Sequence, residues 1–286
     1  MSEAQWDVEE LLALGRWMET RPSALVKVAE GWLRVRDRAG LERPLRANAV
    51  QRAFERERGR QNIVLKARQM GITTWVAGRF FLKTITARGV MTVQVAQTRE
   101  AAEGIFRMVQ RFWECLPEGL REGALRRSKA NAGQMCFPAL DSEFRVVSAG
   151  DENAGRGLTV QYLHCSEVSR WPGDAGATLA GLRAALAPGG EMVMESTPNG
   201  AYGCFYEEWG KAVSSAGAPS DVVRHFFPWW MEEAYVGAAV EEMREDEVAL
   251  VEREGLSAEQ IGFRRGLERS YGGANWGVVA GVSLDV

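Results

Sequence analysis

Cysteine, histidine and long apolar runs are scarce in this sequence, and each scarcity excludes a class of protein. There are four cysteines and two histidines, and no CxxC pair occurs, so a structural zinc site has no ligand set. We interpret the cysteines as reduced, buried thiols: Cys115, Cys136, Cys165 and Cys204. No apolar run approaches the roughly 18 residues of a membrane-spanning helix. Because the acidic, amphipathic start does not resemble a signal peptide, we expect a cytoplasmic protein without membrane contact.

Positive and negative charges are unevenly distributed along the chain, although the net charge is only −3. Residues 32–68 hold eleven Arg and Lys against four Asp and Glu, whereas residues 232–254 hold nine acidic residues against two arginines. The basic stretch is either a solvated helix face or a surface for an anionic partner such as nucleic acid. We interpret the acidic stretch as an exposed helix.

Strand-like and helix-like segments alternate from residue 61 onward. Strands are predicted at 61–66, 90–97, 143–150, 158–167, 190–197 and 221–227, with an edge strand near 133–138, and helices at 73–87, 99–115, 176–187 and 202–213. This alternation predicts an α/β fold, a mostly parallel sheet with helices on both faces. We divide the chain into a helical and hairpin segment (1–58), a core (59–230) and a helical lid (231–286).

A phosphate-binding loop is suggested by "KARQMGITT" at residues 66–74, which follows a strand and precedes a helix. Gly71 permits a close backbone approach to phosphate, and the Thr73 hydroxyl suits Mg²⁺. The expected lysine after the glycine is missing, because Ile72 occupies its place. Lys66 and Arg68 are the two cations that flank the loop, and either could take over the role of that lysine. The motif is therefore a failed match to the usual pattern.

Two further polar clusters lie at the carboxyl ends of predicted strands, where open parallel sheets bind their ligands. Glu167 ends one strand and could orient an attacking water, but it could equally cap a turn. Ser166, where an aspartate is usual, could reach Mg²⁺ only through a bound water. The third cluster, "STPNG", is either a plain turn or a sensor of the γ-phosphate, with Ser196, Thr197 and Asn199 as its polar groups.

Taken together, these segments resemble the ATPase domain of large terminase subunits, the motors that package DNA into tailed-phage and herpesvirus capsids. "LKARQMGITT" resembles that family's variant phosphate loop, "LHCSEVSRWP" its acidic strand end, and "ESTPNGAYGCFYEEW" its coupling motif. "VAQTREAAEGIF" resembles the segment after the second core strand, and "NAVQRAF" resembles the adenine-recognising Q motif. The resemblance runs from about residue 30 to residue 273 in the family's order.

The resemblance implies an ASCE-type P-loop ATPase that uses ATP and Mg²⁺ to move double-stranded DNA, with Glu167 as the catalytic base. It implies an arginine finger at Arg156, reaching a neighbouring subunit of a ring, and portal and small terminase subunits as partners in a bacterial host cell. The implied ATP-binding residues are Gln51, Lys66, Ala67, Arg68, Gln69, Met70, Gly71, Ile72, Thr73 and Thr74. Arg68 is also a candidate catalytic cation, Thr73 and Ser166 are candidates for Mg²⁺, and Ser196, Thr197 and Asn199 for coupling.

The family's nuclease domain has no counterpart in this sequence, so we expect no nuclease activity. An ATPase fragment, a truncated prophage gene and a motor with a separate nuclease chain all remain open. Other functions also remain open: a helicase-like or remodelling ATPase, or a catalytically weak scaffold that binds portal or small terminase.

Overall fold

A seven-stranded sheet forms the centre of the protein, whose computed structural model describes residues 6–37, 39–128, 133–151, 157–212 and 221–271. Its strands lie in the order β5-β6-β4-β7-β8-β3-β9, and every neighbouring pair is parallel except β5 with β6. The strands are β3 (Gln61–Lys66), β4 (Met91–Ala96), β5 (Gln134–Phe137), β6 (Ser142–Ser148), β7 (Val160–Ser166), β8 (Leu186–Ser196) and β9 (Val222–Phe227). The predicted α/β class and the predicted edge strand are confirmed.

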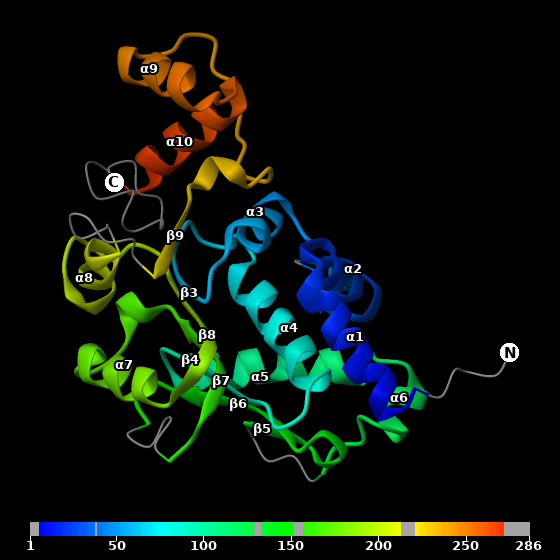
Figure 1. The fold of residues 1–286 in the computed structure, drawn as a ribbon. Coiled ribbons are helices and arrows are strands. Elements are labelled where there is room, and N and C mark those ends of the chain that lie inside the picture. Colours follow the sequence, from blue (N-terminus) through cyan, green and yellow to red (C-terminus); the bar gives the residue numbers. More distant parts are fainter. Residues whose placement is uncertain (1–5, 38, 129–132, 152–156, 213–220, 272–286) are drawn as a thin grey trace, which may run out of the picture.

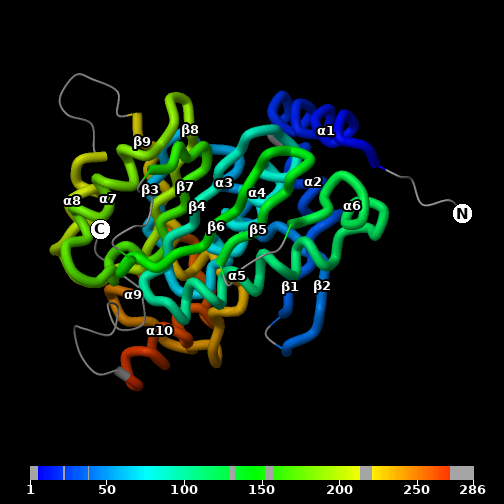
Figure 2. The backbone as a smooth tube through the Cα atoms, turned by 90° about the horizontal axis from the view of Figure 1, so that it is seen from below, coloured from blue at the N-terminus to red at the C-terminus, as the bar shows by residue number. Residues whose placement is uncertain are grey.

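Helices cover both faces of this sheet, and a small hairpin lies before it (Figures 1 and 2). The N-terminal segment holds α1 (Val8–Thr20), α2 (Pro22–Trp32), the hairpin β1 (Arg34–Arg36) and β2 (Glu42–Pro44), and α3 (Ala49–Glu57). The helices that follow are α4 (Ile72–Ile85), α5 (Arg99–Glu114), the short α6 (Glu118–Glu122), α7 (Ala175–Ala184), α8 (Gly203–Lys211), α9 (Glu245–Glu254) and α10 (Ala258–Tyr271). Of these, the sequence reading missed α6.

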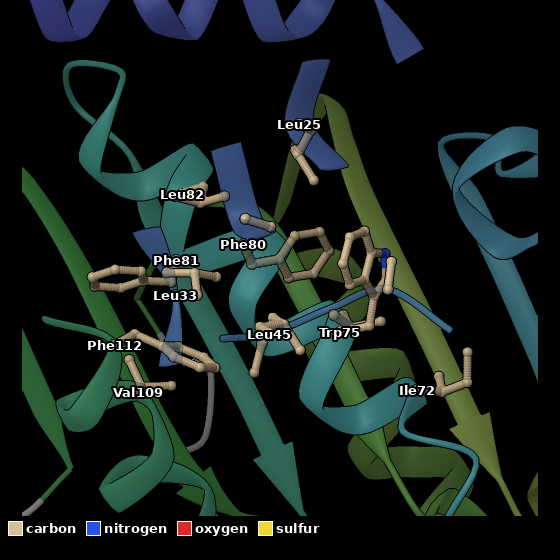
Figure 3. Close-up of a cluster of buried hydrophobic side chains, with 14 of the residues drawn as sticks. Leu25, Leu33, Leu45, Ile72, Trp75, Phe80, Phe81, Leu82, Val109 and Phe112 are labelled. Atoms are coloured by element: carbon tan, nitrogen blue, oxygen red, sulfur yellow. The ribbon is translucent and has the colours of Figure 1, made fainter. Parts of the chain in front are cut away.

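Two hydrophobic cores lie on opposite faces of the sheet. The larger packs α1 to α5 against one face, and Figure 3 shows Leu33 and Leu45 of the N-terminal segment meeting Phe81 of α4 and Phe112 of α5. The smaller core packs Leu182 of α7 and other residues of α7 and α8 against the other face. Apolar side chains point both ways from the central strands: in β3, Val64 belongs to the larger core, and Ile63 and Leu65 belong to the smaller one.

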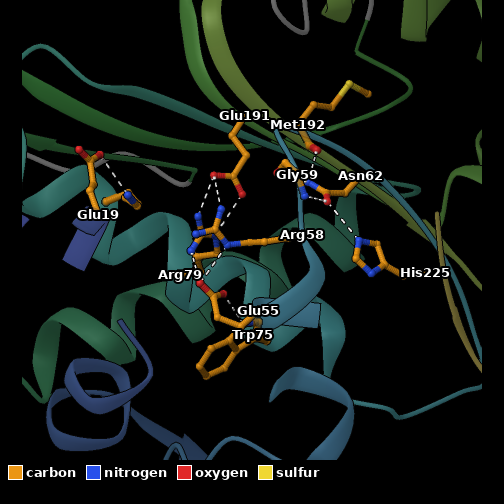
Figure 4. A network of polar contacts seen from close by, with 11 residues as sticks. Glu19, Glu55, Arg58, Gly59, Asn62, Trp75, Arg79, Glu191, Met192 and His225 are labelled. Atoms are coloured by element: carbon orange, nitrogen blue, oxygen red, sulfur yellow. Dashed lines mark hydrogen bonds and ion pairs between the residues drawn. The ribbon is translucent and has the colours of Figure 1, made fainter. Parts of the chain in front are cut away.

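A buried ion-pair network lies beneath α4 (Figure 4). The guanidinium of Arg79 contacts Glu55 of α3 at 2.7 Å and Glu191 of β8 at 2.8 Å, and the Trp75 indole N–H donates to Glu55 at 3.2 Å. Burial by itself lowers the pKa of Arg79, but the charges of Glu191 and Glu55 outweigh that effect and raise it. The network ties α3, α4 and the sheet together.

Two expectations about other parts of the chain are wrong. The acidic stretch 232–254 is not one exposed helix, because helix α9 begins only at Glu245 and the preceding residues are irregular. Within α9, Glu247 is buried and binds the Arg265 guanidinium at 2.6 Å. All four cysteines are free, but only Cys165 is buried. In the described part of the chain, no helix is long and apolar enough to cross a membrane.

Candidate functional site

The candidate site lies where β3, β7 and β8 end, and it begins with the loop from β3 to α4. Gly71 adopts a left-handed conformation at the N-terminus of α4, with φ of 75°, and no side chain caps this end of the helix. The backbone N–H groups of residues 69–73 donate to no described residue. Unpaired N–H groups at the start of a 14-residue helix form a site for an anion.

The carbonyl groups of this loop, in contrast, are held by other parts of the protein. The Asn48 side chain donates to the Met70 carbonyl at 3.2 Å, and the Gln51 side chain donates to the Gly71 carbonyl at 2.9 Å. The Tyr235 hydroxyl donates to the Arg68 carbonyl at 2.6 Å. These bonds satisfy the carbonyls with donors from other parts of the protein, whereas the N–H groups of residues 69–73 donate to no described residue.

Gln51 therefore supports the loop directly. Its side-chain oxygen accepts a hydrogen bond from the Asn48 backbone at 3.0 Å, and only 4% of its surface is exposed. An added Cβ on Gly71 would lie 2.6 Å from the Gln51 amide nitrogen, so this contact requires glycine. In this structure the Gln51 amide is engaged by the protein. Its expected role with adenine stays a prediction.

Of the two candidate cations, Lys66 lies inside the site and Arg68 lies on the surface. Lys66 is the last residue of β3, and its ammonium group contacts Glu167 at 2.8 Å and Glu195 at 3.2 Å. Burial alone lowers the pKa of Lys66, but the charges of Glu195 and Glu167 outweigh it and raise the pKa to about 12. Lys66 is thus fully charged at neutral pH, whereas the Arg68 side chain is exposed and has no ion pair among the described residues.

Glu167 lies directly beside this cation. It follows β7 in a left-handed conformation, with φ of 52°, which is rare for a residue with a side chain. Its second oxygen accepts hydrogen bonds from the Thr197 backbone at 3.2 Å and from the Thr197 hydroxyl at 3.0 Å. Backbone strain of this kind persists where surrounding contacts hold it, as is common in functional sites.

The coupling segment is bonded to the segment that carries Glu167. The hydroxyls of Ser196 and Ser169 lie 2.6 Å apart, and Ser169 also donates to the Thr197 carbonyl at 2.9 Å. The Asn199 side chain donates to the Ser169 carbonyl at 3.0 Å. Residues 196–199 are therefore hydrogen-bonded both to Glu167 and to the segment that follows it.

Oxygen-bearing side chains form the buried part of the site. The hydroxyls of Thr73 and Ser166 each donate to the same oxygen of Glu195, both at 2.7 Å. Thr73 is half-buried and Ser166 is buried. Carboxylate and hydroxyl oxygens suit Mg²⁺, so this set fits the predicted cation. Sequence reasoning missed Glu195, although it directly precedes the "STPNG" cluster and lies four residues after Glu191, another acidic residue of the same strand.

The structure thus brings together the three polar clusters that were predicted at the carboxyl ends of strands. Lys66 contacts Glu167, which binds Thr197, and Thr73 contacts Glu195 beside them, whereas Ile72 points into the core and is fully buried (Figure 3). The remaining residues of the predicted loop are Ala67, Gln69, Met70 and Thr74. Of these, Gln69 also adopts a left-handed conformation, with φ of 56°. Arg156 lies outside the described residues, so its role stays a prediction.

The described residues include no group of three or more histidine, cysteine or acidic side chains that could form a protein-only metal site. The site has Glu167 and Glu195 near hydroxyl groups instead. Mg²⁺ commonly keeps several waters and binds through few protein groups together with phosphates, so this sparse donor set is of the expected kind.

Comparison with known proteins gives no match by sequence and several by structure. No protein-family model matches the chain, and no curated protein matches its sequence significantly. The large terminase of bacteriophage HK97 superimposes with a TM-score of 0.63 at 16% identity, covering 87% of this chain and 51% of that one. The chain therefore spans about half the length of the HK97 protein.

Two other solved structures are similar at lower scores. The large terminase ATPase domain of Thermus phage P74-26 has a TM-score of 0.49 at 20% identity, covering 65% of this chain and 82% of that one. The large terminase of a thermophilic bacteriophage, in complex with ADP, has a TM-score of 0.48 at 13% identity, covering 77% and 46%. The similarity of fold rests on the HK97 protein, because its TM-score exceeds 0.5. This chain therefore shares its fold with a phage large terminase over 87% of its length.

Proposed function

We propose that this chain is an ATP-hydrolysing motor domain that drives double-stranded DNA into a procapsid. The observation that carries the proposal is the loop at residues 66–73. The N–H groups of residues 69–73, at the start of α4, donate to no described residue, and a buried lysine lies at the beginning of the loop beside a strained glutamate. An anion cradle, a fixed cation and an adjacent carboxylate are the parts that phosphoryl transfer requires. The shared fold with a phage large terminase supports the DNA-packaging role.

In this proposal Lys66 replaces the missing lysine of the loop. Its ammonium group enters from the strand before the loop and contacts Glu167 and Glu195 in this structure. Bound phosphates would compete with these carboxylates for the same cation. Arg68, exposed on the loop, remains a candidate for a second contact with phosphate.

Glu167 is the proposed base. Its carboxylate lies at the carboxyl end of β7 and is oriented by Thr197, so it can accept a proton from a water above the loop. Thr73 and Ser166 would hold Mg²⁺, the latter through a bound water. When bound, Mg²⁺ neutralises charge on the phosphates. The hydrogen bonds between residues 196–199 and Ser169 are a direct mechanical link from Glu167 to the coupling segment.

The test measures phosphate release and ADP binding for Glu167→Gln, with and without double-stranded DNA. We expect the variant to bind nucleotide like the wild type and to lose turnover by about 100-fold or more, the typical contribution of a general base. Glu103→Gln on the exposed face of α5 is the matched control and should retain turnover. Turnover of Glu167→Gln within about threefold of wild type would remove Glu167 as the base.

We also propose that Arg156 acts in a neighbouring subunit of a ring, together with portal and small terminase partners. An arginine finger is typically worth about 10³–10⁵ in rate. Mixing Arg156→Ala with Glu167→Gln should then restore activity, because mixed rings contain interfaces with an intact finger and an intact base. If light scattering shows that rings form and the mixture nevertheless stays inactive, Arg156 does not act in trans.

A further inference from the structure

Glu195 has no role in the mechanism proposed above, yet it contacts both the loop and the strand that leads to Glu167. Its carboxylate is fully buried. One oxygen accepts from the hydroxyls of Thr73 and Ser166, both at 2.7 Å, and the other lies 3.2 Å from the ammonium of Lys66. The phosphate cation and the hydroxyl expected to hold Mg²⁺ thus share one anionic partner.

The sheet order explains why this carboxylate reaches both sides of the site. Strand β8 lies between β7 and β3. Ser166 of β7 is the register partner of Glu195, and Leu65, next to Lys66 on β3, is the register partner of Ser196. Position 195 therefore lies on the strand between the one that leads to Glu167 and the one that leads into the loop, so its side chain can contact residues from both.

The surroundings of Glu195 keep it charged. Burial by itself raises the pKa of Glu195, but the positive charge of Lys66, together with nearby His164 and the hydrogen bond from Ser166, outweighs burial and holds the pKa well below its usual range. His164 is fully buried and lies 3.4 Å from the same carboxylate oxygen that accepts from Thr73. Burying a carboxylate costs free energy of folding unless the carboxylate is paired with a cation and hydrogen-bonded, as Glu195 is here.

We propose that Glu195 supplies the acidic group that this site lacks at position 166, and that it positions Thr73 and Lys66 for a magnesium nucleotide. Phosphate-loop ATPases commonly carry an aspartate at the end of the strand before the water-activating residue, where it serves Mg²⁺. Here that position holds Ser166, and the carboxylate comes from the neighbouring strand. Glu195 is a positioning residue, and the inference rests on the proposed function as an ATPase.

The test measures ADP affinity by calorimetry, once in Mg²⁺ and once in EDTA, so that it does not depend on turnover. In the wild type, Mg²⁺ should strengthen ADP binding. In Glu195→Gln, which keeps the size and loses the charge, we expect that gain to fall by about 10-fold or more, as is typical when a partner of a metal ligand is removed. Affinity in EDTA should change less.

A second variant moves the carboxylate instead of deleting it. Ser166→Asp combined with Glu195→Gln places an acidic group at the usual position and keeps the net charge of the buried cluster. This double variant should regain the magnesium effect to within about threefold of wild type, a difference below 1 kcal/mol. A purely structural role for Glu195 would not predict rescue by relocation. If Glu195→Gln alone does not fold, the double variant still decides the question.

Glu191→Gln is the matched control. Glu191 lies on the same strand four residues earlier and is also buried, but it binds Arg79 at the other end of the sheet. Its variant should lose stability and keep the magnesium effect. An unchanged magnesium effect in Glu195→Gln, or a folded double variant without any, would overturn the role of Glu195. A wild type that binds no ADP at all would instead refute the proposed function.

Discussion

Replacing Lys66 by methionine should destabilise the protein strongly in the absence of nucleotide. The substitution keeps most of the side-chain length and removes the charge that two carboxylates share. Glu195 would then be a fully buried anion with only hydroxyl groups and His164 beside it. Removing one partner of a buried ion pair typically costs about 3–5 kcal/mol, because the other charge is left uncompensated.

The raised pKa of Lys66 gives an independent lower estimate. A shift from 10.5 to about 12 corresponds to ~2 kcal/mol of net favourable interaction with the charged lysine. In the wild type this contribution is fully present below pH 10.5, the unfolded value, and is lost as pH rises through about 12. The lysine contribution is therefore constant across the neutral range, and the cost of the substitution lies between about 2 and 5 kcal/mol.

The pH dependence of the variant distinguishes this mechanism from a simple packing defect. Without Lys66, burial dominates and the pKa of Glu195 should rise above 4.5, the ordinary value. A group whose folded pKa is raised binds its proton more readily in the folded state, so the variant should regain stability as pH falls toward 4.5. The deficit relative to wild type should therefore be largest at neutral pH and smaller in mild acid.

Urea unfolding followed by fluorescence of the ten tryptophans measures both effects. With a urea slope of about 3 kcal/mol per molar, the midpoint of Lys66→Met should fall by about 1 M at neutral pH. Arg68→Met is the control, because that side chain is exposed on the same loop and should shift stability by less than about 0.5 kcal/mol. Equal stability of Lys66→Met and wild type, or a deficit that does not narrow in acid, would refute the buried ion pair.

Two further predictions concern the loop and the network beneath α4. Gly71→Ala should lower stability by about 1–2 kcal/mol and weaken ADP binding, since alanine is strained at positive φ and its Cβ would displace Gln51; calorimetry showing wild-type affinity would contradict this. Arg79→Met should cost about 3–5 kcal/mol in urea unfolding, because Glu55 and Glu191 lose their shared buried cation; a variant as stable as wild type would show that the network is dispensable.

The sequence by itself determined the order and type of nearly all elements of the sheet. Strand β3 spans Gln61–Lys66 as predicted, because a short apolar run is bounded by a polar segment and by a glycine-containing loop. Strands ending at one edge also predicted that Lys66, Glu167 and the coupling segment would meet. These conclusions rest on residue propensity and hydrophobic periodicity, which depend only on residues that are close together in the sequence.

Only the tertiary structure decided which side chains share a contact. The sequence analysis gave Glu195 no role, although it directly precedes the "STPNG" cluster. Its meeting with Ser166 follows from the register of β7 and β8, and its meeting with Thr73 from the packing of α4 on the sheet. Likewise the hydrogen bond from Gln51 to Gly71 joins residues 20 apart.

The tertiary structure also decided which of the two candidate cations is buried. Lys66 and Arg68 are equivalent by spacing, since both flank the loop. Lys66, the last residue of β3, is buried beside the buried Glu195 and the partly exposed Glu167, which stabilise its charge, whereas Arg68 is exposed on the loop. Burial and charge partners depend on elements distant in the sequence, and a local pattern contains no information about them.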